Sequence, residues 1–159
     1  MNGHYIRGKE RDELYELCLP YFEHTGDFDV DWIKDVIFSV RDKMTFLTDV
    51  NRLTEVYFNP HKPDEESIKL LNLETSLPVL ESYKRKVSGL KKLDSELYHD
   101  ITKQIQDETK AKGKALYMVL RIGITGSRMG PDMDKLACLI PTEEQVRRID
   151  SIINMLRKR

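Results

Sequence analysis

Apolar residues recur every three or four positions along most of this chain, the spacing that places them on one face of an α-helix. The pattern predicts a first helix that ends at Gly26, a second with Asp31 as its N-cap, and a third between Met44 and Tyr57. The apolar face of the first helix is formed by Leu14, Leu17, Cys18, Tyr21 and Phe22. The first part of the chain is therefore expected to be helical.

A stretch with two prolines separates these helices from the rest of the chain. Pro60 and Pro63 lie within the sequence FNPHKPDEE, and we expect a boundary there between two subdomains, 1–60 and 61–159. Pro63 and the acidic residues after it predict a helix start, because a fixed φ and negative charge both favour the first turn. Pro78 either interrupts the segment that follows or begins a new helix there.

Two further helices are predicted in the second half. A narrow apolar stripe indicates a long charged helix that ends near Ala111, and its members are Leu93, Leu97, Ile101 and Ile105. Residues Thr142 to Gln145 form a capping-box sequence, which predicts the start of the last helix. The one strand-like sequence, LYMVLRIGI, is short and isolated. We therefore expect an all-α fold, a helical bundle of two packed subdomains.

The glycine-containing stretch at residues 120–141 predicts a bend between two helices. Gly126 is suited to a left-handed helix stop, and Gly123 allows another part of the protein to approach the backbone closely. Gly130 and Pro131 then predict the start of a new helix.

Arg121 is the one charged residue in the apolar run that leads into this bend. Its guanidinium must either pair with an internal Asp or Glu or reach a cleft, where it would bind an anion or a base edge. Upstream lysines, together with Arg121 and Arg128, form either a basic wall suited to phosphate contacts or the solvated end of a helix. These lysines are Lys103, Lys110, Lys112 and Lys114.

Composition narrows the class of protein. Of the 159 residues, 40% are hydrophobic and 33% are charged, which is typical of a soluble protein. No apolar run approaches the ~20 residues that a membrane span requires. Residues 1–5 show no secretory leader, so we expect a cytoplasmic protein with no membrane partner. Cys18 and Cys138 lie far apart and are expected to be reduced, mostly buried thiols.

The net charge of −1 conceals an uneven distribution along the chain. Residues 1–80 contain 9 basic and 16 acidic side chains, whereas residues 81–159 contain 17 basic and 11 acidic ones. The basic second half suggests a polyanion partner, although solvated helix faces explain the same distribution equally well.

The common catalytic and cofactor signatures are missing from the sequence. Gly123, Gly126 and Gly130 have neither the P-loop spacing nor the dinucleotide fingerprint. Asp132 and Asp134 supply too few oxygens for a calcium loop, and the four histidines are too scattered for a zinc site. The residues themselves therefore do not favour a freestanding enzyme.

The stretch KGKALYMVLRIGITGSRMGPDMDKLACLIPTEEQVRRI resembles the C-terminal part of bacterial glutamyl-tRNA synthetases, the class I glutamate–tRNA ligases. The opening NGHYIRGKERDELYELCLPYF and the segment VRDKMTFLTDV are similar to earlier regions of the same family, in the same order. The resemblance covers essentially the whole chain. It implies a helical cage, the anticodon-binding region of an enzyme that joins glutamate to its tRNA.

The resemblance also implies that the parent enzyme uses ATP and magnesium. Neither ATP-handling signature of the family, His-Ile-Gly-His or Lys-Met-Ser-Lys-Ser, occurs in this sequence. We therefore expect no cofactor here and an expressed fragment without activity of its own.

Roles of individual residues follow from the same resemblance. Arg121 matches an arginine that contacts an anticodon base, and Gly130, Pro131 and Met133 match residues that lie against the anticodon bases. Lys43 stands where related enzymes have an arginine that reads the third anticodon base and helps to reject glutamine tRNA. A lysine lacks the planar fork needed for bidentate reading. Weaker contacts with the RNA backbone are expected from Arg41, Lys103, Lys112, Lys114 and Arg128.

We therefore expect a monomeric RNA-binding region that binds glutamate tRNA and not DNA. The alternative is a helical protein-interaction module that binds no RNA and uses the acidic first half as its docking surface.

Overall fold

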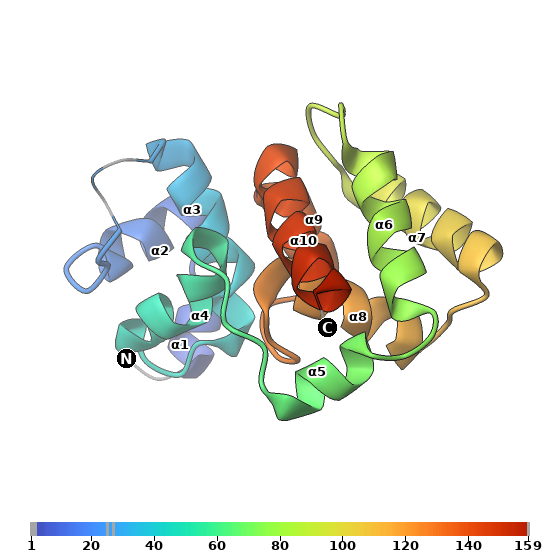
Figure 1. Cartoon of the computed structure of the whole chain (residues 1–159). Coiled ribbons are helices and arrows are strands. Elements are labelled where there is room, and N and C mark those ends of the chain that lie inside the picture. Colours follow the sequence, from blue (N-terminus) through green and yellow to red (C-terminus); the bar gives the residue numbers. More distant parts are fainter. Residues whose placement is uncertain (1–2, 25, 27, 159) are drawn as a thin grey trace. The chain divides into compact units, whose positions relative to one another are not determined.

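The computed structural model describes residues 3–24, 26 and 28–158, which form ten α-helices and two 3₁₀ helices (Figure 1). These residues contain no β-strand, so the all-α expectation is confirmed. The strand-like sequence LYMVLRIGI lies inside α8 (Lys114–Thr125). Met1 and Asn2, on which the expectation about a leader partly rests, lie outside the described residues.

The chain divides into two compact units, Met1–Phe58 and Asn59–Arg159. In the first unit, α2 (Arg11–Cys18) packs against α3 (Val30–Ser39), which in turn packs against α4 (Val50–Phe58). Its smaller elements are α1 (Gly3–Arg7), η1 (Arg41–Lys43) and η2 (Leu47–Asp49). Its buried side chains include Ile6, Leu14, Ile33, Ile37 and Met44.

Two helix boundaries in the first unit differ from the sequence expectation. The first amphipathic helix ends at Cys18 and not at Gly26, because Pro20 has no backbone N–H with which to continue the helix. Asp29, and not Asp31, caps α3, since the Asp29 carboxylate accepts a hydrogen bond from the Asp31 N–H at 3.4 Å. A cap thus lies two residues earlier than the apolar pattern indicated.

The expected third helix is also divided. Met44 is buried but lies between η1 and η2, outside any α-helix. The Asp49 carboxylate accepts hydrogen bonds from the N–H groups of Thr45 and Phe46, each at 3.0 Å, and so holds this part of the chain in a turn. The same two bonds lower the pKa of Asp49. Helix α4 therefore starts only at Val50.

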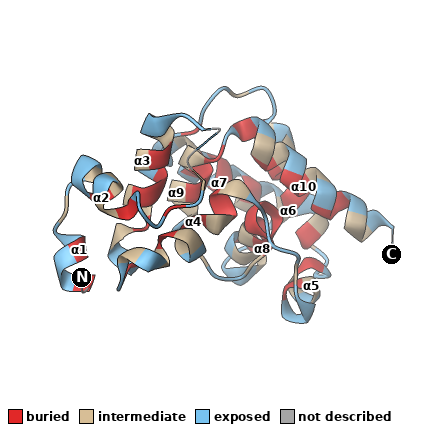
Figure 2. Cartoon of the chain, turned by 90° about the vertical axis from the view of Figure 1, so that its left-hand side faces the viewer, coloured by how far each residue is buried: buried red, intermediate tan, exposed pale blue. Residues whose placement is uncertain are grey.

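The second unit is built around α6 (Ser76–Val87), which contacts α7 (Ser95–Thr109), α8 and α10 (Thr142–Arg157). Helix α5 (Glu65–Leu71) packs against α8, and α9 (Met133–Leu139) packs against α7. Figure 2 shows buried and exposed positions alternating along α10, as expected for a helix with one face in a core. The largest buried side chains include Leu80, Tyr83, Ile105, Leu116 and Leu120.

The helix start expected after Pro63 is confirmed, with Asp64 as the N-cap that accepts a hydrogen bond from the Ser67 N–H at 2.8 Å. Pro78 begins a helix rather than interrupting one, since it lies in the first turn of α6. The helix expected after Gly130 and Pro131 starts at Met133.

The capping box predicted at residues Thr142 to Gln145 is wrong. The Thr142 hydroxyl donates to the Leu90 carbonyl at 2.6 Å instead of capping its own helix. The Gln145 side chain is buried, donates to the carbonyls of Ala137 and Ile140 at 2.7 Å, and accepts from the Tyr83 hydroxyl at 2.6 Å. Gln145 therefore joins α10 to α6 and to the end of α9, because a buried amide must find its partners within the fold.

Both expectations about the glycines of α8 are confirmed. Gly126 ends the helix with φ of 75°. A Cβ atom at Gly126 would overlap the backbone carbonyl of His61, and one at Gly123 would lie 2.6 Å from Leu80 Cδ2. Close packing as well as left-handed geometry therefore requires glycine at position 126.

We predict that Gly126→Ala lowers the free energy of unfolding by more than about 3 kcal/mol, because a positive φ and a backbone overlap act together. Gly89 is the matched control, since it has φ of 88° and a methyl group added there would have nothing within 4 Å. Gly89→Ala should cost only about 1 kcal/mol. Urea unfolding of both variants measures the difference, and equal losses would contradict the role of the His61 contact.

Candidate nucleic-acid interface

Three carbonyl groups in the C-terminal turn of α8 accept hydrogen bonds that hold this turn in place. The His61 N–H donates to the Thr125 carbonyl at 2.6 Å, and the Gly126 N–H donates to the Ile122 carbonyl at 2.7 Å. The Arg148 guanidinium donates to the Ile124 carbonyl at 3.1 Å. These contacts satisfy carbonyls that a helix end otherwise leaves without partners. The end of α8, one turn after Arg121, is therefore firmly placed.

Arg121 lies one turn before this end and is partly buried. Its Nη1 atom donates to the Pro131 carbonyl at 2.8 Å. The internal ion pair that the sequence left open is not formed among the described residues, since the partner of Arg121 is a backbone carbonyl. A guanidinium has five N–H donors, so most of its hydrogen-bonding capacity remains for a ligand.

Burial lowers the pKa of Arg121, while Tyr98 and Asp132 act in the opposite direction. The group stays cationic, because an arginine in a protein is not deprotonated. A partly dehydrated cation without a carboxylate partner gains from an incoming anion or base edge, which replaces the hydration it has lost.

The turn between α8 and α9 brings Gly130 and Pro131 against this guanidinium. A Cβ atom at Gly130 would lie 3.3 Å from Arg121 Nη1, and the Pro131 carbonyl accepts its hydrogen bond. Met133 is the first residue of α9 and is partly buried. Arg121, Gly130 and Pro131 are therefore in contact, and Met133 follows directly in the chain.

A groove of about 520 Å³ lies between α5, the first half of α8 and the turn after α8. Its basic residues include Lys114 and Arg128, and its apolar residues include Met129, which is 81% exposed. The full lining is Glu66, Lys69, Leu70, Leu73, Lys114, Met118, Arg128 and Met129. The groove combines exposed apolar side chains with cations, and cations that line a groove are suited to phosphate contacts.

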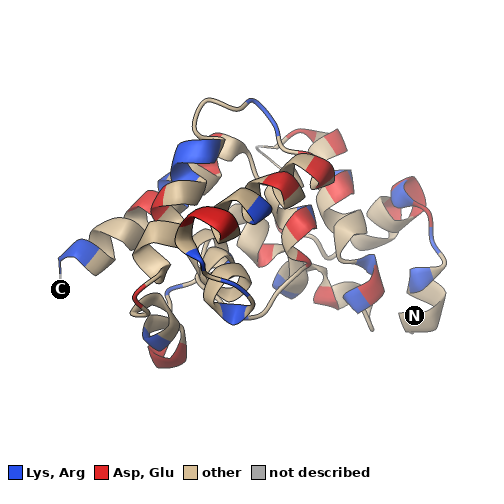
Figure 3. Cartoon of the chain, turned by 90° about the vertical axis from the view of Figure 1, so that its right-hand side faces the viewer, with Lys and Arg blue, Asp and Glu red and all other residues tan. Residues whose placement is uncertain are grey.

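The charges around this groove are partly neutralised. Arg128 pairs with Asp64 at 3.3 Å, and Lys69 pairs with Glu66 at 3.1 Å. Lys103 and Lys112 are exposed but do not line the groove. Figure 3, which faces the α6–α7 side of the second unit, shows Lys and Arg interspersed with Asp and Glu. The cations on the face shown in Figure 3 thus do not form a continuous basic wall.

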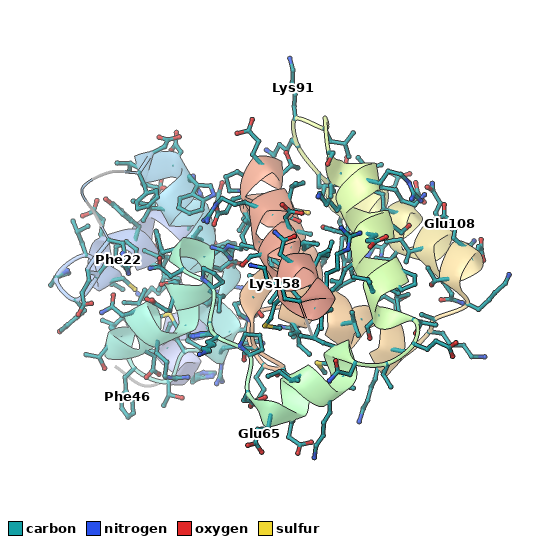
Figure 4. The ribbon with its side chains drawn as sticks, viewed as in Figure 1. Phe22, Phe46, Glu65, Lys91, Glu108 and Lys158 are labelled. Carbon is teal, nitrogen blue, oxygen red and sulfur yellow. The ribbon has the colours of Figure 1, made fainter. Side chains whose placement is uncertain are left out.

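Arg41 and Lys43 belong to the first unit, where they lie in η1. The Arg41 guanidinium lies 4.6 Å from the centre of the Phe38 ring and donates to the Lys9 carbonyl at 3.1 Å, so packing within the unit holds it. Lys43 is exposed. Phe46, labelled in Figure 4, lies in the loop after it and is 57% exposed. An exposed aromatic ring thus lies three residues beyond Lys43 in the chain.

Two residues of the second unit were missed by the sequence reasoning. Arg148 is only 3% exposed, and its guanidinium pairs with Glu144 at 2.9 Å. The four-residue spacing of Glu144 and Arg148 in a helix was the available signal. Tyr98 is also buried, and its hydroxyl has no hydrogen-bond partner among the described residues. No sequence pattern pointed to Tyr98, because its surroundings come from three helices.

Both cysteines are free thiols, with Cys18 buried and Cys138 partly buried. Burial raises the pKa of Cys18 to about 12, so this thiol is not reactive at neutral pH. Among the described residues no cluster of three or more His, Cys, Asp or Glu side chains could hold a metal ion. In the same part of the chain, no helix is both long enough and apolar enough to span a membrane.

A family model described as an anticodon binding domain matches residues 13–153. The match covers most of both units, and the chain belongs to this family.

Curated relatives are similar over nearly the whole chain. A glutamate–tRNA ligase of Bacillus cereus is 29% identical, over 96% of this chain and 33% of the relative. Glutamate–tRNA ligase 1 of Caldicellulosiruptor saccharolyticus is 26% identical, over 94% of this chain and 33% of the relative. The chain thus spans about a third of the length of these relatives.

Solved structures show the same fold. A glutamate tRNA ligase from Elizabethkingia meningosepticum, crystallised with its amino acid, matches with a TM-score of 0.84 and 20% identity, over 98% of this chain and 31% of that chain. The glutamate–tRNA synthetase of Elizabethkingia anophelis matches with a TM-score of 0.78 and 20% identity, over 96% of this chain and 30% of that chain. The expected helical cage is confirmed at the level of the fold.

We predict that Glu144→Gln destabilises the protein by about 1–3 kcal/mol at neutral pH, because the buried Arg148 loses its charged partner. Burial by itself raises the pKa of Glu144. The hydrogen bonds from Arg147 and Arg148 together outweigh burial, so the pKa lies below the ordinary value of 4.5. The stabilisation is therefore fully present above pH 4.5 and is lost as the pH falls through the lowered value.

Chemical unfolding of the original chain and Glu144→Gln between pH 7 and pH 3 measures this effect. The difference between them should stay constant down to about pH 5 and shrink below it. Glu66→Gln is the control, because Glu66 forms an exposed pair with Lys69 worth less than about 1 kcal/mol. A difference that grows on acidification would contradict the assignment.

Proposed function

We propose that this chain recognises the anticodon of glutamate tRNA as part of a glutamate–tRNA ligase. The observation that carries the proposal is the partly buried Arg121, bound to the Pro131 carbonyl and without a carboxylate partner among the described residues. Arg121 lies in a chain of the anticodon binding domain family. The curated relatives to which this chain is similar are glutamate–tRNA ligases. The helical protein-interaction module gains no support from these relatives.

Anticodon bases are unpaired, so they can leave the stack and present their edges to side chains. Arg121 reads one such edge with the N–H groups that Pro131 does not use, while Gly130, Pro131 and Met133 pack against the bases. Lys114 and Arg128 contact phosphates across the groove that they line. Arg41, Lys103 and Lys112 supply weaker backbone contacts. Each bidentate contact contributes roughly 1–3 kcal/mol of discrimination.

Lys43 takes part in reading the third anticodon base from the first unit. Its ammonium is a point charge, and so it distinguishes bases less strictly than the planar guanidinium of an arginine would. The proposal therefore includes relaxed discrimination against glutamine tRNA at this position.

The whole protein, on this proposal, is a monomeric cytoplasmic enzyme that attaches glutamate to tRNA with ATP and magnesium. ATP binding does not fit the residues of this chain, because neither ATP-handling signature occurs in it. Among the residues that the structure describes, no three or more potential metal ligands form a cluster. Its contribution is to bind and orient the tRNA, and the chemistry belongs to the remainder of the enzyme.

We predict that Arg121→Ala weakens binding of a glutamate-tRNA anticodon stem-loop by about 10- to 100-fold, because a base-reading guanidinium is lost. The affinity should fall far more than the thermal stability, since the fold loses only the hydrogen bond to the Pro131 carbonyl. Fluorescence anisotropy at two salt concentrations measures the affinity. Arg85→Ala is the control, because it removes the same charge from an exposed position on α6. Equal losses in both variants would leave only a general charge effect and contradict base reading.

We further predict that Lys43→Arg sharpens discrimination at the third anticodon base by several-fold, because a planar fork can make two hydrogen bonds to one base. The measurement compares stem-loops that differ only at that base. Lys103→Arg serves as the control, since it makes the same change at an exposed position on α7. Unchanged discrimination in Lys43→Arg would remove Lys43 from the reading site.

A further inference from the structure

The Tyr98 hydroxyl is buried without a hydrogen-bond partner. The residue is 2% exposed, and its oxygen is one of two buried side-chain polar atoms without a partner among the described residues. A buried hydroxyl that makes no hydrogen bond lowers stability, because it has lost its hydrogen bonds to water and no protein group replaces them. Replacement by phenylalanine would remove that cost without leaving a void. Packing alone therefore does not explain a tyrosine at this position.

The surroundings of Tyr98 indicate the group with which its hydroxyl can form a hydrogen bond. Tyr98 lies on α7, which packs against α9. Burial is the largest cause of the raised pKa of Tyr98. The residues that act on this phenol electrostatically lie on two other helices, and they are Tyr117 and Arg121 of α8 and Asp134 and Cys138 of α9. Each of these two pairs is four residues apart, which places its members on one helix face. The phenol is therefore buried within electrostatic reach of groups on α8 and α9, the Arg121 guanidinium among them.

The two groups complement each other chemically. The phenol is neutral at physiological pH, so its oxygen can accept a hydrogen bond while its O–H donates one. Arg121 donates a hydrogen bond to the Pro131 carbonyl and keeps further N–H donors. Arg121 thus has unused donors and Tyr98 an unused acceptor, and each group acts electrostatically on the other.

We propose that Tyr98 is a positioning residue for Arg121: in the RNA-bound protein its hydroxyl oxygen accepts a hydrogen bond from the guanidinium and fixes the guanidinium plane toward the base. This inference rests on the function proposed above and assigns a specificity role to a residue that does not touch RNA. A bidentate contact depends on the orientation of the fork, so a group that fixes the plane acts on discrimination.

Tyr98→Phe tests the proposal, because it removes the hydroxyl and keeps the ring. Binding of the anticodon stem-loop should weaken about tenfold, and discrimination should fall for the base that Arg121 reads, which stem-loops altered at each anticodon position identify in turn. The midpoint of thermal unfolding should stay the same or rise, since a buried unsatisfied group is gone. A merely structural role for the hydroxyl would lower stability and leave discrimination unchanged.

Tyr83→Phe is the matched control within the same unit. Its hydroxyl is equally buried but donates to the Gln145 carbonyl oxygen at 2.6 Å, so its removal leaves a buried acceptor without a partner. Tyr83→Phe should therefore lower the unfolding midpoint and leave RNA binding intact. In an Arg121→Gln background, Tyr98→Phe should have no further effect on affinity, because the group that it positions is absent.

The outcomes separate this inference from the proposed function. If the unmodified chain binds the stem-loop with base dependence and Tyr98→Phe binds equally well, the positioning role is wrong and the anticodon-reading function stands. A full tenfold effect of Tyr98→Phe in the Arg121→Gln background would likewise overturn the coupling to Arg121. If the unmodified chain binds no stem-loop even at low salt, the proposed function fails and this inference fails with it.

Discussion

The contact between the end of α8 and the His61 backbone is the constraint on which the candidate site depends. Because Gly126 has no side chain, the His61 carbonyl lies where a Cβ atom would otherwise be, and the His61 N–H binds the Thr125 carbonyl at 2.6 Å. Helix α8 therefore ends at a fixed point, and the chain turns back through Gly130 and Pro131. Arg121 meets that turn because it lies one helical turn earlier. A longer or frayed α8 would separate the guanidinium from the residues that it contacts.

Buried polar groups hold this arrangement from within the second unit. Arg148 links Glu144 to the Ile124 carbonyl, and Gln145 links Tyr83 to the end of α9. Each group is removed from water and satisfied by the fold, so each specifies a geometry as well as contributing to stability. Arg121 and Tyr98 differ, since the guanidinium binds a single carbonyl and the phenol has no hydrogen-bond partner among the described residues. Arg121 and Tyr98 thus keep unused hydrogen-bonding capacity, and a ligand can use the donors that Arg121 retains.

On the proposed function, recognition by this chain depends on few groups rather than on overall charge. The net charge is −1, and several cations near the groove already have acidic partners, including Arg128 with Asp64. Non-specific attraction to a polyanion is consequently modest, and the proposed base-edge contacts would provide much of the selectivity. The groups proposed to read bases lie on two units, each with its own core. Such separate cores allow Lys43 and Arg121 to be held independently.

The helical class and the position of the bend could be predicted from the sequence, because the three-and-four apolar spacing and the glycines act locally. Arg121 was also predictable, since a lone charge in an apolar run requires an explanation. The helix end at Cys18 follows from Pro20, which has no backbone N–H to offer. The cap at Asp29 and the hydrogen bond of Thr142 were decided by side chains that compete for backbone groups, and local patterns could not rank those competitors. The carbonyl partners of Arg121 and Arg148 and the surroundings of Tyr98 emerged only in the folded chain, because they come from segments that are not neighbours in the sequence.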